Sequence, residues 1–229
     1  MILLLDIGNS RIKWTVERNG TVETATAIAH NKIDFIKDLH DSWSKLQSLQ
    51  LLAISSVSSN YIVQQIIDLA NTLWPGVSVL TAKSSAQFLQ VSNCYQNPEK
   101  LGIDRWLGLI ALHHYCSGKS CVIDCGTAIT IDSLDEAGQH LGGLISPGLG
   151  LMKRSLSVET ENLSFNDQGF PLELANHTEA AIYAGVLYAA TGLIEKTVAD
   201  LMVGETVILT GGDAELIAKN LSFKVMIEP

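Results

Sequence analysis

An acidic turn that occurs twice constrains the fold of this chain more than any other feature. The first copy lies in LLLDIGNSRIKWTV near the N-terminus, and the second lies in VIDCGTAITID at residues 122–132. In each copy an apolar strand runs to an aspartate (Asp6 or Asp124), turns through a glycine and continues as a second strand. The same offset in sequence carries Gly20 onto Gly138. We therefore expect two β-hairpins of matching length, each opening one of two similar α/β halves.

The remaining sequence alternates strand and helix patterns in both halves. The first half predicts a strand at 51–57, a helix from Ser58 or Ser59 to the WPG turn, a strand at 77–82 and a helix at 104–116. The second half predicts a helix at 178–202, a strand at 206–212 and a helix at 214–221. With a boundary near Gly118, the domains would comprise residues 1–117 and 118–229.

Composition excludes several classes of partner. The formal net charge is −9 and no basic cluster is present, which argues against a nucleic-acid or anionic-membrane surface. No stretch approaches the roughly 18 apolar residues of a membrane span. The four cysteines form no CxxC pair, so we interpret them as reduced thiols and expect a soluble, cytoplasmic protein.

The paired turns have the chemistry of a phosphate site. Glycine permits backbone conformations in which successive N–H groups point into one concavity, where phosphate oxygens bind. Asn9, Ser10 and Thr127 add side-chain donors, and an aspartate beside the turn can hold a cation. An ordinary hairpin turn is the alternative for either copy alone, but two copies in register favour phosphate binding. GGLISPGLG at 142–150 and LTGGDA at 209–214 are two further glycine-rich elements.

Five motifs in order connect the chain to a known family. DIGNS, GIDR, DCGTA, GGLISPGL and TGGDA resemble the type III pantothenate kinases, which belong to the acetate kinase, sugar kinase, Hsp70 and actin superfamily. The resemblance implies two duplicated ribonuclease-H-like domains of the actin-like ATPase fold, facing one another across a cleft. It also implies a homodimer that phosphorylates pantothenate to 4′-phosphopantothenate, the first step of coenzyme A biosynthesis. ATP with Mg²⁺ and a monovalent cation (K⁺ or NH₄⁺) would be required.

The resemblance also implies a role for individual residues. The ATP-binding residues would be Asp6, Ile7, Gly8, Asn9, Ser10, Arg11, Ile12, Lys13 and Thr127. The pantothenate site would contain Tyr95, Gly102, Ile103, Asp104, Arg105 and Thr178, with Asp104 as the general base. Asp124 would lie at the monovalent cation. Ser10 and Ile103 depart from the residues commoner in the family, threonine and alanine, but Ser10 keeps the hydroxyl.

Several of these residues have a second interpretation. Asp104 at a helix start could simply cap backbone N–H groups, and Arg105 could be a surface ion-pair partner rather than a clamp for the pantothenate carboxylate. Small residues recur along one face of the 178–202 helix, where they could pack within the monomer or against a second subunit; they are Ala181, Gly185, Ala189 and Gly192.

Two other functions compete with the leading hypothesis. One is a kinase of another small hydroxy acid or sugar on the same fold, although a carboxylate clamp argues against a neutral sugar. The other is a non-catalytic regulator. Loss of Asp6, Asp104 or Thr127 would have favoured the regulator, and all three residues are present.

Overall fold

The computed structural model describes residues 1–30, 34–158, 169–201 and 204–228. Contacts divide the chain into two compact units. Unit 1 comprises Met1–Ser85 and Asn97–Leu107, and unit 2 comprises Ala86–Gln96 and Gly108–Pro229. The domain boundary near Gly118 stays a prediction about the duplication.

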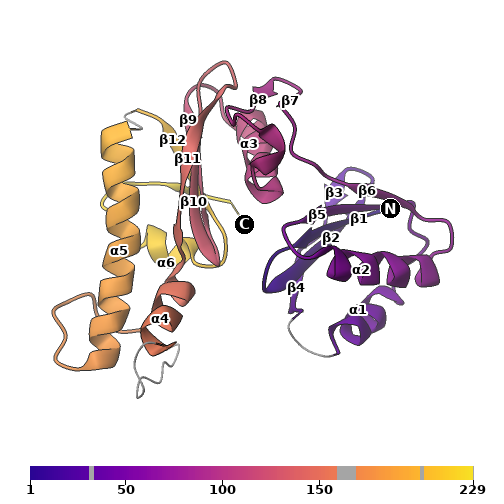
Figure 1. The fold of residues 1–229 in the computed structure, drawn as a ribbon, viewed down its shortest axis with the longest axis horizontal. Helices are drawn as coiled ribbons and strands as arrows, with labels where there is room; N and C mark the ends of the chain where they lie inside the picture. The colour runs from indigo at the N-terminus through magenta and orange to yellow at the C-terminus, as the bar shows by residue number, and fades with distance from the viewer. Residues whose placement is uncertain (31–33, 159–168, 202–203, 229) are drawn as a thin grey trace. The chain divides into compact units, whose positions relative to one another are not determined.

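Unit 1 is a mixed sheet with two helices on one face (Figure 1). Its strand order is β3-β2-β1-β5-β6, and β4 also pairs with β2. β1 and β2 are antiparallel, whereas β5 is parallel to both β1 and β6. The elements are β1 (Ile2–Ile7), β2 (Arg11–Arg18), β3 (Thr21–Val22), β4 (Thr26–Ala29), α1 (Phe35–Trp43), β5 (Leu51–Ser56), α2 (Asn60–Leu73) and β6 (Ser78–Thr81), with the short helix η1 (Pro98–Lys100).

Alternation along β2 explains how this sheet buries one face. Ile12 and Trp14 are buried, whereas Arg11 and Lys13 between them remain exposed. Trp14 packs edge-on against Trp43 of α1, with ring centroids 6.3 Å apart. The helices therefore cover the apolar face of the sheet, and the charged side chains of β2 lie on the other face.

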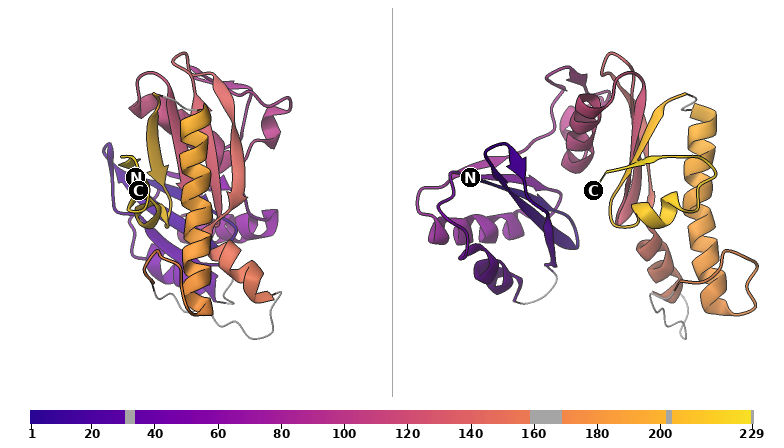
Figure 2. Two further views of the ribbon diagram at one scale, coloured as in Figure 1. Left: turned by 90° about the vertical axis from the view of Figure 1, so that its left-hand side faces the viewer. Right: turned by 180° about the vertical axis from the view of Figure 1, so that it is seen from behind.

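Unit 2 repeats the same sheet. Its order is β11-β10-β9-β12-β13, again with an antiparallel hairpin followed by two parallel strands. Helix α5 lies along one face, and the part of α3 beyond Gly108 lies on the opposite face (Figures 1 and 2). The elements are β7 (Gln87–Phe88), β8 (Val91–Ser92), α3 (Ile103–Tyr115), β9 (Ser120–Cys125), β10 (Ala128–Leu134), β11 (His140–Pro147), α4 (Leu149–Val158), α5 (Thr178–Leu201), β12 (Thr206–Thr210), α6 (Ala214–Ala218) and β13 (Met226–Ile227).

The duplicated hairpins predicted from the sequence are confirmed. The Gly8 N–H donates to the Arg11 carbonyl over 3.0 Å, and the Gly126 N–H donates to the Ala128 carbonyl over the same distance. Gly20 and Gly138, in the second turns, both have φ of +82°. The correspondence extends to the parallel neighbours, because Asp6 lies opposite Ser55 and Asp124 lies opposite Thr210.

Most elements predicted beyond the hairpins are confirmed, although the strand predicted at 206–212 ends at Thr210. The GGLISPGLG element forms the end of β11 and the start of α4. Helix α6 ends at Ala218 rather than at residue 221, because the N–H groups of Asn220 and Leu221 bond to carbonyls three residues back and tighten the chain into turns. Helix α5 is described to Leu201, so its predicted last residue, Met202, lies outside the described residues.

Among the described helices, we find none with the length and apolar character that crossing a membrane requires.

Candidate active site

The first glycine turn in unit 1 joins β1 to β2 and is braced from beneath by a histidine. His30, which follows β4, is buried. Its ring Nε2 lies 2.8 Å from the Gly8 carbonyl oxygen, and its backbone N–H donates to the Ser10 carbonyl over 3.3 Å. Asn9 and Ser10 are exposed at the tip, as a phosphate-binding loop requires. His30 was not anticipated from the sequence, because nothing local links it to a turn 20 residues earlier.

Two of the predicted ATP-binding side chains point into the core. Ile7 and Ile12 are fully buried in the hydrophobic cluster of unit 1. Only their backbone groups are therefore available to a ligand, and Ile103 in the predicted pantothenate site is buried in the same way.

Asp6 lies in an environment that perturbs its charge. It lies opposite Lys13 on β2 and Ser55 on β5, and all three border a largely apolar cavity of about 480 Å³ in unit 1. Desolvation raises the pKa of Asp6, and this effect is the largest. The Ser55 hydroxyl and the Lys13 charge lower that pKa, whereas the Asp104 charge raises it. Asp104 therefore lies close enough to Asp6 for the two carboxylates to repel one another, although they are far apart in sequence.

These oxygen donors fit a magnesium ion bound together with phosphate. Ser55 is buried, and its hydroxyl makes no hydrogen bond within the described residues. The same hydroxyl lowers the pKa of Asp6, so it lies near that carboxylate. Mg²⁺ on a nucleotide typically takes one or two carboxylates, substrate phosphates and waters. No cluster of three acidic, histidine or cysteine side chains suited to a metal occurs in the described part of the chain, and such an ion does not need one.

The Gly102–Arg105 segment begins helix α3. One Asp104 carboxylate oxygen accepts the Arg105 N–H over 2.8 Å, so the capping role is real. A carboxylate has further lone pairs, and Asp104 is exposed, so a substrate hydroxyl can also bind it. Gly102 permits this arrangement because a Cβ there would lie 2.6 Å from Asp104 Oδ1.

Arg105 is buried, with only 7% of its surface exposed. Arg105 therefore does not lie on the surface, whereas its role as an ion-pair partner or as a carboxylate clamp stays a prediction. A buried guanidinium is held in place by its surroundings, and it can present two parallel donors to a carboxylate.

The second glycine turn, in unit 2, is enclosed by the two other glycine-rich elements. The Gly148 N–H donates to the Thr127 carbonyl over 3.0 Å, and a Cβ at Gly148 would overlap the Gly126 carbonyl oxygen. A Cβ at Gly211, which has φ of +95°, would likewise overlap a carboxylate oxygen of Asp124. Three motifs that are far apart in sequence therefore meet at one place, which leaves Thr127 exposed.

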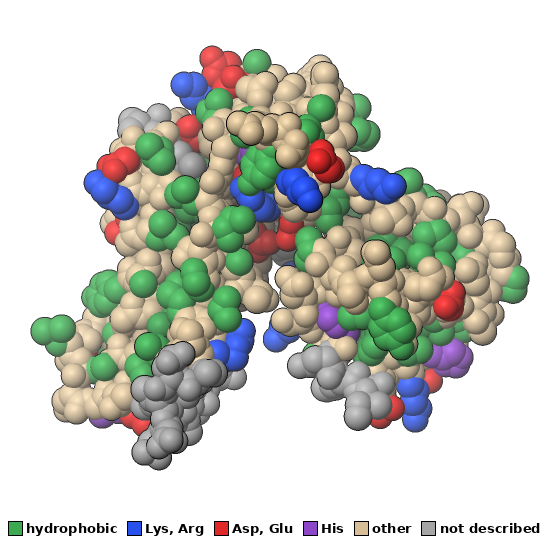
Figure 3. All heavy atoms as spheres, viewed as in Figure 1, with side chains coloured by type: hydrophobic (Ala, Val, Ile, Leu, Met, Phe, Trp, Pro, Cys, Tyr) green, Lys and Arg blue, Asp and Glu red, His purple; other side chains and the backbone are tan. Residues whose placement is uncertain are grey.

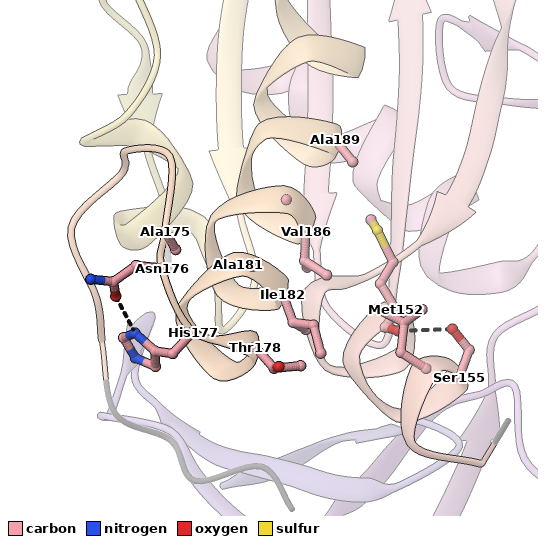
Figure 4. A pocket seen from close by; sticks show the side chains of 12 residues that line it. Met152, Ser155, Ala175, Asn176, His177, Thr178, Ala181, Ile182, Val186 and Ala189 are labelled. Carbon is pink, nitrogen blue, oxygen red and sulfur yellow. Dashed lines mark hydrogen bonds between the residues drawn. The ribbon is translucent and has the colours of Figure 1, made fainter. Parts of the chain in front are cut away.

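A groove in unit 2 separates α4 from the first half of α5. Its volume is about 760 Å³, and Thr178 and Ile182 of α5 and Met152 of α4 project into it (Figure 4). The four small residues of the α5 stripe are all exposed, so no other described part of the chain covers them. Hydrophobic side chains also spread over the α4–α5 region in the space-filling view (Figure 3).

Tyr95 lies at the other end of unit 2 from Thr178. Its ring stacks on His140, with centroids 6.0 Å apart and planes 15° apart, at the start of β11. Thr178 lines the groove beside α4, which follows the opposite end of β11. The strand between them spans roughly 20–25 Å at about 3.3 Å per residue. Within one subunit, Tyr95 and Thr178 cannot contact one small substrate.

Comparison with solved structures defines the class of protein. A Campylobacter jejuni protein described as a conserved Baf family member superposes with a TM-score of 0.60 at 22% identity, covering 99% of this chain and 90% of that one. The ethanolamine utilization protein EutJ from Carboxydothermus hydrogenoformans gives 0.54 at 13% identity, over 98% and 83% of the two chains. The fold is the duplicated ribonuclease-H-like fold of the actin-like ATPases and sugar kinases, as predicted.

Sequence comparison narrows the class to a family. The family model for type III pantothenate kinase matches residues 2–200. A type III pantothenate kinase from Nitrosococcus oceani is 38% identical over 228 residues, which cover 95% of this chain and 85% of that one. The chain belongs to the type III pantothenate kinase family.

Proposed function

We propose that the chain transfers the γ-phosphoryl group of ATP to the 4′-hydroxyl of pantothenate, the first step of coenzyme A biosynthesis. The observation that carries this proposal is the proximity of Asp104 to Asp6, which brings a candidate base next to a candidate phosphate loop. The four cysteines are free thiols rather than disulfides, and this agrees, together with the use of ATP, with a cytoplasmic location.

In this mechanism Asp104 orients the pantothenate hydroxyl and accepts its proton as the oxygen attacks the γ-phosphorus. The Gly8–Ser10 turn and Lys13 bind phosphate oxygens in unit 1, and the Thr127 hydroxyl and adjoining N–H groups bind them in unit 2. A magnesium ion held by Asp6 would neutralise phosphate charge. Arg105 reads the pantothenate carboxylate through two parallel hydrogen bonds.

A monovalent cation is proposed at Asp124. The carboxylate lies at the point where the second turn, Gly211 and the Cys125 carbonyl come together, so several oxygens are close by. Activity should rise when sodium is replaced by potassium or ammonium, and Asp124→Asn should flatten that response. Equal rates in all three salts would remove the cation from the proposal but leave the kinase activity unaffected.

A homodimer is proposed with the pantothenate site shared between subunits. Two observations support it: the small residues of α5 are exposed beside an apolar groove, and Tyr95 is a strand length away from Thr178. In a two-fold dimer, Thr178 of one subunit can complete the site that contains Tyr95 of the other.

The test is an ADP-release assay with pantothenate and with pantothenol, in which an alcohol replaces the carboxylate. Arg105→Lys loses the bidentate pair, and charge-assisted hydrogen bonds contribute about 1.5–3 kcal/mol, so the pantothenate KM should rise roughly 10- to 100-fold. The ATP KM should stay within about twofold. Pantothenol should be a poor substrate for the native protein and should lose much less on mutation.

Two outcomes would contradict this. If Arg105→Lys weakens pantothenol and pantothenate equally, Arg105 has a structural role. If the native protein phosphorylates neither compound, the proposed activity is wrong.

A further inference from the structure

A cysteine, a histidine and an aspartate form a line of contacts in unit 2 that the proposed phosphoryl transfer does not use. Cys94 Sγ lies 3.4 Å from His140 Nδ1, and His140 Nε2 lies 3.0 Å from Asp132 Oδ1. His140 and Asp132 are both buried, with about 1% of their surface exposed, whereas Cys94 is exposed. The order of groups is that of a nucleophile, a base and the carboxylate that orients the base.

A β-bulge puts the histidine on the face of the aspartate. The β10–β11 ladder shifts by one residue between Ser133 and Leu134, so that Leu134 lies opposite His140 instead of residue 141. A slip of one residue moves a side chain to the other face of a sheet. Leu134 shares its face with Asp132, and the bulge therefore places His140 on that face too.

Hydrogen bonds hold the segment that contains Cys94 against the turn between β10 and β11. The Ser92 N–H donates to the Gly138 carbonyl over 3.0 Å, and Gln139 Nε2 donates to the Ser92 carbonyl over 3.4 Å. A Cβ at Gly138 would overlap the Gln90 carbonyl, so glycine is needed for this close approach. Two residues beyond Ser92, the chain brings Cys94 to His140.

The geometry sets the proton positions. Asp132 accepts the N–H of His140 Nε2, which leaves Nδ1 with a lone pair directed at the thiol. Transfer of the thiol proton to Nδ1 gives a thiolate beside an imidazolium that Asp132 stabilises. A neighbouring imidazolium typically lowers a cysteine pKa to about 3.5–7.5, and the thiolate is the reactive form.

The other titratable groups near this line are few among the described residues. Tyr95 stacks on His140, Asp135 in the adjoining turn accepts the N–H groups of Ala137 and Gln139, and His113 of α3 contacts Gln90. The other cysteines lack such an environment. Burial raises the pKa of Cys116 and Cys121, and raises that of Cys125 to about 12. Cys121 also faces Glu205 and Asp132, whose charges raise its pKa further.

We propose that Cys94 is an activated thiol, modified by small electrophiles and oxidised by hydrogen peroxide with His140 and Asp132 as positioning residues. The thiolate sulfur attacks one peroxide oxygen, an S–O bond forms as the O–O bond breaks, and the leaving hydroxide takes the proton from the His140 imidazolium to become water. The sulfur is oxidised to a sulfenic acid while the peroxide is reduced. Because Tyr95 adjoins Cys94, the adduct obstructs pantothenate binding; this consequence alone rests on the proposed function.

The first experiment measures alkylation of the full chain by iodoacetamide from pH 5.5 to 9.5, with each cysteine quantified by peptide mass spectrometry. We expect Cys94 to react at least tenfold faster than Cys116 at pH 7, with a midpoint below the ordinary thiol value of about 8.5. Asp132→Asn should move the midpoint upward. A native midpoint at or above 8.5 overturns the proposal whether or not that variant folds, and so does an unchanged midpoint in the folded variant.

The second experiment treats the protein with hydrogen peroxide and traps sulfenic acid with dimedone. We expect the adduct on Cys94, a rise of at least tenfold in the pantothenate KM that dithiothreitol reverses, and no such rise in Cys94→Ser. Adduct formation with an unchanged KM would overturn the obstruction. Adduct formation on a protein without kinase activity would leave the thiol site standing and refute the proposed function instead.

Discussion

At the scale of single residues, two carboxylates in unit 1 lie in different surroundings. Both are exposed, but Asp104 accepts a backbone N–H of α3, whereas Asp6 borders an apolar cavity and has a raised pKa. Desolvation disfavours the charged form of Asp6, and a bound cation would favour it. A site that is costly to build without its ligand is typical of function rather than of packing.

Replacing Asp104 tests the proposed base. Asp104→Asn keeps the shape and an acceptor for the Arg105 N–H, but cannot take a proton. Turnover should fall by about 10²-fold or more, since general-base catalysis typically contributes about 10²–10⁴-fold. Steady-state kinetics measure the loss, and circular dichroism should show a native fold. Near-full activity in the pure variant would return Asp104 to a capping role.

Replacing Asp6 tests the cost of its charge. A carboxyl whose pKa is raised on folding destabilises the native state where it is ionised, so Asp6→Asn should be more stable than the native protein at pH 7. Because Asp6 keeps solvent access, the gain should stay below about 1 kcal/mol.

The pH dependence of that gain has a definite sign. The difference should vanish below the ordinary aspartate pKa and grow as the pH rises through the folded-state pKa. Urea unfolding from pH 4 to pH 8 measures it, together with loss of kinase activity. A variant that is less stable at every pH would mean that favourable contacts of the carboxylate outweigh its desolvation.

At the scale of elements, close backbone approach explains the glycines around the second turn. Gly148 lies at the β11–α4 junction and has no room for a side chain, because the carbonyl oxygens of Gly126 and Thr127 occupy the space. Its φ is not in the left-handed region, so contact alone requires the glycine. The junction thereby fixes the height of the turn that carries Thr127.

Replacing Gly148 should displace that turn. Gly148→Ala should lower the free energy of unfolding by about 1–3 kcal/mol, as overpacking does, and raise the ATP KM. Gly108→Ala is a matched control, because its Cβ would meet Val122 at an ordinary 3.9 Å in a helix interior. Urea titration and initial-rate kinetics measure both variants. Equal behaviour of the two would mean that the turn yields easily at Gly148.

At the scale of the whole molecule, unit 2 carries two candidate substrate contacts that one subunit cannot bring together. Tyr95 stacks at the start of β11, and Thr178 lines the groove near its end. The exposed stripe of α5 adjoins that groove, which is the surface expected of a helix that packs closely against a partner.

Mixing two inactive variants tests the shared site. Tyr95→Ala and Thr178→Trp should each be inactive alone. In a two-fold dimer, each mixed molecule contains one site with both native residues, so a random equimolar mixture should regain roughly a quarter of native activity. Co-expression with two affinity tags isolates the mixed dimer. Mixed dimers without activity would mean that one subunit supplies the whole site.

Local chemistry explains what the sequence determined by itself. The two hairpins, their glycine turns, the strand alternation and the start of α3 depend on backbone conformation and on side-chain period, and both are written in neighbouring residues. The exposed donors of the first turn and Thr127 were predicted from the same local signal. An aspartate and a glycine at the end of an apolar strand indicate a tight turn, and these donors lie in it.

Only the tertiary structure decided which distant groups meet. Three contacts join segments that are far apart in sequence, and neither segment of a pair predicts the other. They are His30 with Gly8, Ser55 with Asp6, and Gly148 with Gly126. A bulge of one residue moves His140 to the face of Asp132 and so creates the contact with Cys94. The alternation of a sheet is local, but its register and its breaks depend on the strands it is paired with.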